Sequence, residues 1–326
     1  MTGRVTELAF GLQGSGQHTE GMPEPARFRA TAELAERLGY DSLWAGDHLS
    51  FANPILDITV ALGAFAACTK RIVLGAGVLL LPLRHPGLVA KQFASLDFLS
   101  EGRIILGIGV GGEGVKDFEA VGVPLRERGA RADEGIRALR ALFAGEPATF
   151  SGRFYDFEGI AVDPPPVQPG GPPIVIGGRS EAALRRAGRL GDGWLAYMAS
   201  TDGFARGLAT MRRHAEEAGR DPEALLPAIV LPTHCDDDGE RARRQTREHL
   251  SRRYAQPFEP HHVERYCVAG TPEECRERLA AYAAAGVRHV VFNPAGPAAG
   301  FLVECERLYV DVAAPLSSGR QARAAL

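Results

Sequence analysis

The chain has 326 residues, of which 45% are hydrophobic and 24% are charged, values ordinary for a globular protein with a sizeable core. Its formal net charge of −3 argues against a nucleic-acid partner, because no basic field would attract phosphates. No apolar run approaches the roughly 20 residues that span a bilayer. Residues 1–10 also lack a basic-then-apolar signal pattern, so we expect a cytoplasmic protein with no membrane partner.

Short β-branched segments alternate with helical patterns along the whole chain. The predicted strands cover residues 5–12, 42–45, 72–79, 103–109, 174–176, 193–197, 226–234 and 288–292. The predicted helices cover residues 24–38, 55–68, 87–98, 131–143, 180–190, 202–218, 238–254, 272–285 and 298–313. Gly39 is well placed to end the first of these helices.

This alternation predicts an α/β fold of the (β/α)8 TIM-barrel type. A doubly wound open sheet is the structural rival, but neither half carries a dinucleotide fingerprint after its first strand. We expect one domain over residues 1–315 and a polar tail over 316–326. Two irregular stretches, 145–173 after strand four and 255–269 after strand seven, indicate insertions that overhang one mouth of the barrel; the first contains a predicted β-hairpin.

The carboxyl ends of barrel strands face the site, and glycines follow the fifth predicted strand. Gly177 and Gly178 let the backbone approach a ligand closely, and Ser180 can cap the next helix, whose N-terminus favours an anion. Arg179 would add a charge-assisted contact. The segment is either a phosphate site or an ordinary tight turn with a capping serine and a solvated arginine.

Alternating glycines end the fourth predicted strand at Gly107, Gly109 and Gly111. Such spacing suits a strand against which a flat ligand packs, although it suits packing against another backbone equally well. Asp47 and His48 follow the second strand, where a carboxylate and an imidazole can manage a proton near neutral pH. The alternative is a capping aspartate and a structural histidine, and we expect the two side chains to act separately.

No metal site is expected. The histidines lie on different predicted elements, and no HxH or HExxH pattern occurs. A serine hydrolase is also not expected, because no GxSxG turn is present. The five scattered cysteines have no short spacing typical of zinc or redox motifs, which predicts free thiols.

Three long blocks resemble the luciferase-like monooxygenase superfamily of flavin and deazaflavin oxidoreductases. They are SLWAGDHL at 42–49, the block from LLLPLRHPGLVAKQ to GIGVGG at 79–112, and the block over 128–194 that contains FSGRFYDF and VIGGRSEAALRRA. Together they cover most of the chain in the expected order. The LPLRHP…AKQ…LSEGR pattern looks most like the deazaflavin branch, which uses coenzyme F420, whereas other members use FMN.

The resemblance implies a role for each position already named. Asp47 and His48 would lie beside the tricyclic ring, with His48 handling a proton, and Gly77 and Val78 would form a bulge, often with a non-proline cis peptide, under one ring face. The implied contacts to the cofactor side chain come from Gly107, Gly109 and Gly111, and those to its phosphate from Gly177, Gly178 and Ser180, beside Arg179.

The leading hypothesis is therefore an F420-dependent oxidoreductase that transfers a hydride to or from a small organic substrate. The alternatives are an FMN-dependent monooxygenase supplied with reduced flavin by a separate reductase, and a flavin-binding barrel without turnover. The resemblance also implies a homodimer. Residues 255–269, with His261 and His262, are a candidate lid, or else an insertion with no part in the chemistry.

Overall fold

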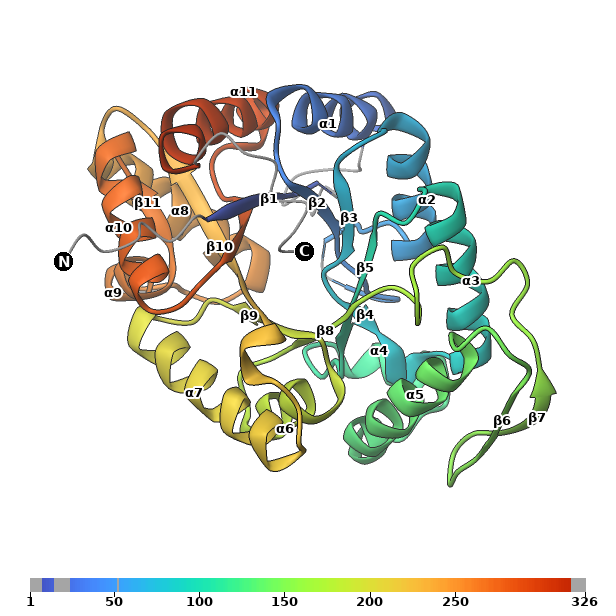
Figure 1. The fold of residues 1–326 in the computed structure, drawn as a ribbon. Helices are drawn as coiled ribbons and strands as arrows, with labels where there is room; N and C mark the ends of the chain where they lie inside the picture. Colours follow the sequence, from blue (N-terminus) through green and yellow to red (C-terminus); the bar gives the residue numbers. More distant parts are fainter. Residues whose placement is uncertain (1–7, 15–23, 52, 318–326) are drawn as a thin grey trace.

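Eight parallel strands close into a barrel in the computed structural model, which describes residues 8–14, 24–51 and 53–317 (Figure 1). Around the barrel the order is β10, β12, β1, β2, β3, β5, β8 and β9, and β9 pairs again with β10. The strands are β1 (Ala9–Gln13), β2 (Ser42–Ala45), β3 (Val73–Ala76), β5 (Ile104–Gly109), β8 (Ile174–Gly177), β9 (Gly193–Tyr197), β10 (Leu226–Cys235) and β12 (His289–Pro294). This closed sheet confirms the predicted barrel and excludes the open-sheet alternative.

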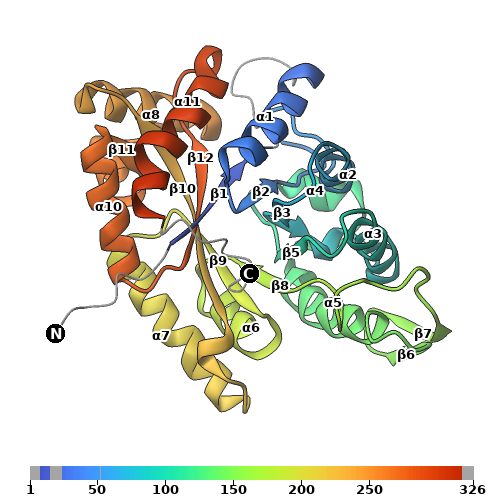
Figure 2. The same cartoon turned by 45° about the horizontal axis from the view of Figure 1, so that its top comes forward.

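A ring of helices covers the outer face of the barrel (Figures 1 and 2). Its members are α1 (Pro25–Leu38), α2 (Ile58–Cys68), α3 (Pro86–Leu99), α5 (Arg128–Leu142), α6 (Glu181–Leu190), α7 (Thr201–Glu217), α10 (Pro272–Ala284) and α11 (Phe301–Arg307). Gly39 ends α1 as predicted, with φ of 97° and its N–H donated to the carbonyl of Ala35. A π-helical segment, η5 (Leu308–Ala313), continues α11.

The remaining elements are additions to the eight strands and the ring of helices. They are β4 (Leu79–Leu80), α4 (Val115–Ala120), the antiparallel pair β6 (Ala148–Ser151) and β7 (Asp156–Ile160), α8 (Gly239–Tyr254), α9 (Pro260–Tyr266) and β11 (Val268–Gly270). The β6–β7 hairpin confirms the hairpin predicted in the first irregular stretch. The short elements α4, α9, β4 and β11 were not predicted, because two to seven residues carry too little periodicity.

The helix α8 does not belong to the ring of helices around the barrel. The helix that contacts α7 and η5 in the ring is α10, whereas α8 packs on α9, β10 and β11. β10 continues past its pairing with β9, and β11 pairs with its last residues, from Thr233 to Cys235. Between β10 and α10 the chain therefore builds α8, α9 and β11 at the carboxyl end of the barrel.

The β6–β7 hairpin lies outside the ring of helices, beside α3 and α5 (Figure 1). We expected this stretch to overhang one mouth of the barrel, but it does not. Glu134 on α5 accepts backbone N–H groups of Phe154 and Tyr155, at 2.7 and 2.9 Å. Farther on, Asp97 on α3 accepts the N–H of Val167 at 2.8 Å. These buried carboxylates fix the stretch to the outer surface.

Two apolar layers form the core. The inner layer fills the barrel with Trp44, Ile105, Val175, Leu195, Ala228, Val230 and Val291, contributed by six of its strands. A larger outer layer lies between the strands and the helices. Trp44 fills the interior next to Gly75, where an added Cβ would lie 2.3 Å from the indole ring, so a larger residue cannot occupy that position.

Some predicted segments fall outside the described residues. Residues 5–7 of the first predicted strand do so, as do 318–326 of the predicted tail. Within the described ranges, no helix combines the length and the apolar character needed to cross a membrane.

Candidate active site

The carboxyl ends of the barrel strands surround a cavity of about 350 Å³. Nine of the eleven predicted site residues line it, namely Asp47, His48, Gly77, Val78, Gly109, Gly111, Gly177, Gly178 and Arg179. Gly107 and Ser180 do not line it. The structure thus brings together positions that lie up to 132 residues apart in the sequence, from Asp47 to Arg179.

One wall of this cavity is a bulge between β3 and β4. The peptide bond between Gly77 and Val78 is cis, as the family resemblance suggested. The glycines of the neighbouring strands make room for the bulge, since a Cβ on Gly109 would lie 2.4 Å from Cγ2 of Val78 and one on Gly177 would lie 2.9 Å from its Cγ1. A Cβ on Gly107 would lie 1.9 Å from the carbonyl oxygen of Ala76. Gly107 therefore supports the bulge from behind.

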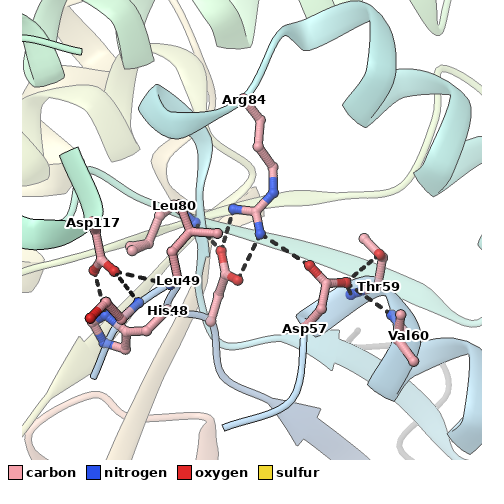
Figure 3. A network of polar contacts seen from close by, with 10 residues as sticks. His48, Leu49, Asp57, Thr59, Val60, Leu80, Arg84 and Asp117 are labelled. Carbon is pink, nitrogen blue, oxygen red and sulfur yellow. Dashed lines mark hydrogen bonds and ion pairs between the residues drawn. The ribbon is translucent and has the colours of Figure 1, made fainter. Parts of the chain in front are cut away.

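Asp47 lies at the end of β2 with 4% of its surface exposed. Its carboxylate accepts two hydrogen bonds from the guanidinium of Arg84, at 2.6 and 2.8 Å, and a third from the N–H of Leu80 at 2.9 Å (Figure 3). Arg84 also lies 3.4 Å from Asp57, the residue that caps α2. Burial lowers the pKa of Arg84, but the bonds to Asp47 outweigh this effect and raise it. Asp47 therefore anchors the chain that follows the bulge.

His48 points away from Asp47 toward a different carboxylate. Its Nδ1 lies 2.8 Å from Oδ2 of Asp117 on α4, and its ring stacks on Phe51 with centroids 4.3 Å apart (Figure 3). Oδ1 of Asp117 accepts the N–H groups of Leu49 and Ser50. No described residue is hydrogen-bonded to Nε2, and His48 lines the cavity. The pair has the form of an oriented general acid or base.

The segment after β8 lines the cavity and also caps the helix that follows, α6. Gly178 has φ of +119°, and its carbonyl accepts the indole N–H of Trp194 at 2.7 Å. Arg179 donates to the carbonyl of Met198 at 2.9 Å, and Oγ of Ser180 caps α6 by accepting the N–H of Ala183. This backbone therefore lies beside the N-terminus of α6, where an anion is favoured.

The insertion after β10 adds residues that were not predicted. Arg253 and Tyr254, at the end of α8, line the cavity, and the Tyr254 hydroxyl donates to that of Tyr197 at 2.7 Å. The same residues border a second chamber of about 740 Å³. From the candidate lid 255–269, Gln256, Pro257, Phe258, His262 and Tyr266 line this chamber, while His261 is exposed.

Two further histidines, His85 and His234, have structural partners. His85 caps α3, and buried His234 contacts Glu304 and Gln245, at 2.7 and 2.8 Å. Burial lowers the pKa of His234, but its bond to Glu304 outweighs this and raises the pKa. Within the described ranges, no three His, Cys, Asp or Glu side chains gather in a way that could hold a metal ion.

A family model described as luciferase-like monooxygenase matches residues 6–289. The chain belongs to this family. A curated relative, the F420-dependent glucose-6-phosphate dehydrogenase of Nakamurella multipartita, is 32% identical to this luciferase-like protein, over 89% of this chain and 91% of the relative. The family assignment makes it a flavin- or deazaflavin-dependent oxidoreductase, as the sequence blocks predicted.

Solved structures of the same fold include a monooxygenase and a reductase. The monooxygenase RslO1 from Streptomyces bottropensis has a TM-score of 0.82 at 23% identity, over 95% of this luciferase-like chain and all of the other. The coenzyme F420-dependent tetrahydromethanopterin reductase of Methanopyrus kandleri has a TM-score of 0.78 at 21% identity, over 95% and 100% of the two chains. These likenesses confirm the barrel.

Proposed function

We propose that the chain is an F420-dependent oxidoreductase that transfers a hydride to or from a small organic substrate. The observation that carries this proposal is a cavity at the barrel mouth lined by the Gly77–Val78 bulge, by the glycine-rich ends of β5 and β8, and by His48, whose ring Asp117 orients. The 32% identity to an F420-dependent dehydrogenase over 89% of the chain supports the deazaflavin over FMN.

The residues present fit such a cofactor. The bulge offers an apolar surface at Val78 for a flat ring, and strand ends without side chains at Gly109 and Gly177 leave only backbone facing it. Gly178 and Arg179, next to the N-terminus of α6 that Ser180 caps, suit a phosphate. The remaining cofactor contacts that we propose are Gly77 and Gly111. Gly107 supports the bulge from behind, and Asp47 positions it through Leu80 and Arg84.

When bound, the deazaflavin supplies the hydride chemistry, and the chain has to orient the substrate and manage a proton. His48 is the group for the proton: Asp117 fixes its Nδ1, which leaves Nε2 for the cavity. Asp47 takes no part in the transfer, because Arg84 and Leu80 already occupy both of its oxygens. The second chamber, walled by Phe258 and Tyr266, is the path for a small substrate.

Equilibrium binding to the purified full-length chain tests the proposal. F420 is expected to bind with micromolar or tighter affinity, read from quenching of its fluorescence, and FMN to bind more weakly. Micromolar affinity for FMN with none for F420 would replace the proposal by the reductase-fed monooxygenase. Tight binding without turnover on any alcohol, aldehyde or sugar phosphate tested would favour the non-catalytic barrel.

We further infer a homodimer. Val60 on α2 and Leu88 and Leu99 on the adjacent α3 each expose 66% of their surface, which is unusual for large apolar residues on neighbouring helices. Light scattering coupled to gel filtration is expected to give twice the 34.9 kDa mass of the chain. A monomer at micromolar concentration would contradict this inference.

A further inference from the structure

Arg253 is a buried cation without a carboxylate partner. Only 7% of its surface is exposed, and its Nε is buried with no hydrogen-bond partner. Among the described residues, no Asp or Glu oxygen lies within 4.0 Å of its guanidinium, although Glu113 lines the same cavities. Buried charges in proteins are ordinarily paired, because an isolated ion loses its hydration. The missing partner therefore has to be explained.

The surroundings of Arg253 suit a ligand more than another protein group. Its guanidinium lies 5.5 Å from the ring centroid of Tyr254, whose hydroxyl donates to Tyr197. A hydroxyl that accepts one hydrogen bond still has a hydrogen to donate, so Tyr197 offers a second donor beside the guanidinium. Arg253 and both tyrosines line the barrel cavity and the second chamber alike. These donors thus stand where the two spaces meet.

We propose that Arg253 binds an anionic group of the substrate, a carboxylate or a phosphate, at the boundary between the cofactor cavity and the second chamber. This inference rests on the proposed function: with the cofactor phosphate at Gly177 and Gly178, Arg253 is a second cationic group in the same cavity that remains for the substrate. A guanidinium binds such oxygens through two parallel N–H bonds, which also fixes the orientation of the bound molecule. The arginine would thereby select anionic substrates over neutral ones.

Arg179 is a weaker candidate for the same task. It is exposed and already donates to the carbonyl of Met198. It lies next to Gly178 and the N-terminus of α6, so it fits the phosphate of the cofactor. The two arginines therefore divide two anionic groups between them, one on each ligand.

Anion binding by the full-length chain saturated with F420, or with FMN if only that binds, tests the proposal. Isothermal titration with inorganic phosphate and with acetate is expected to detect one of the two anions. Arg253→Met should weaken this binding by about tenfold or more, as expected for loss of a charge-assisted pair. Arg253→Lys should give an intermediate affinity, because the charge remains without the fork. Arg244→Met, an exposed position on the same helix, is the matched control and should change nothing.

Cofactor affinity, measured in parallel, shows whether Arg253 binds an anionic group of the substrate or the phosphate of the cofactor. If Arg253→Met lowers cofactor affinity tenfold while anion binding persists, the arginine serves the cofactor phosphate and the proposal is wrong. It is equally wrong if the wild-type chain binds neither anion, or if Arg253→Met binds them as well. Should Arg253→Met fail to fold by circular dichroism, the lysine variant decides. Failure to bind either cofactor would reject the proposed function, and titration of the cofactor-free chain would still test Arg253.

Discussion

Nδ1 of His48 lies 2.8 Å from Oδ2 of Asp117, a residue 69 positions farther along the chain. Asp117 is 1% exposed, and its other oxygen accepts the N–H groups of Leu49 and Ser50. The aspartate therefore fixes both the imidazole and the loop that carries it. This geometry leaves Nε2 of His48 for the cavity. A test of proton handling should therefore change His48.

Replacement of His48 by Ala should lower kcat by about 10²–10⁴-fold, the range for loss of a general acid or base. Affinity for the cofactor should stay within a few-fold, because the ring contacts we propose come from Val78 and from the backbone of Gly109 and Gly177. Steady-state kinetics and cofactor titration measure the two effects. His214→Ala, on α7 where the imidazole ring contacts Glu181 of α6 and does not line the cavity, should leave both unchanged. Unchanged turnover in the His48 variant would remove this residue from the mechanism.

Replacement of Asp47 by Asn should reduce the free energy of unfolding by about 2–4 kcal/mol, because the mostly buried Arg84 loses its two charge-assisted bonds. Asp57, 3.4 Å from Arg84, compensates only in part. Urea denaturation followed by circular dichroism measures the change. In the Asp47→Asn background, Arg84→Met should cost much less than in the wild type, since the cation is already unpaired. Additive effects would show that the two side chains do not interact.

The barrel could be predicted because each strand is a short apolar run bounded by turn residues, and each is followed by a helical pattern. The helix over 238–254 was also predictable, but its position outside the ring was not, for a physical reason. Residues 239–254 have the periodicity of any amphipathic helix, and periodicity does not reveal whether the buried face meets the barrel wall or an insertion. Only the packing of α10 against α7 and η5 shows which helix belongs to the ring.

The part of the site that follows strand ends was predictable, because barrel geometry gathers those ends whatever the sequence between them. The role of Asp117 was not predictable, because its short helix VKDFEA carries no motif and because His48, which it contacts, lies 69 residues earlier in the chain. Arg253 did leave a signal. It continues a buried stripe on α8 with Ala242, Thr246 and His249, spaced three or four residues apart, in which polar members indicate a face that lines a cavity.

Acid should destabilise the protein through His289. This side chain is fully buried, with Nε2 2.7 Å from Oγ of Ser42, and burial lowers its pKa to about 3. Unfolded chains bind the proton near pH 6.5, so stability present above that pH is lost as pH falls from about 6.5 toward 3. His289→Gln should reduce the pH dependence of the unfolding free energy in this range. Exposed His261→Gln should not change it, and an unaltered slope in the first variant would contradict the prediction.

Replacement of Gly107 by Ala should displace the bulge. The added Cβ would lie 1.9 Å from the carbonyl oxygen of Ala76, a backbone atom that cannot rotate away. We expect a loss of about 1–3 kcal/mol of stability and weaker cofactor binding, measured by thermal unfolding and fluorescence titration. Gly63→Ala on α2 is the control: its Cβ would meet only Leu96, at 3.8 Å, and alanine favours the helix. A Gly107 variant as stable as the control, with unchanged cofactor affinity, would show that the bulge does not depend on this contact.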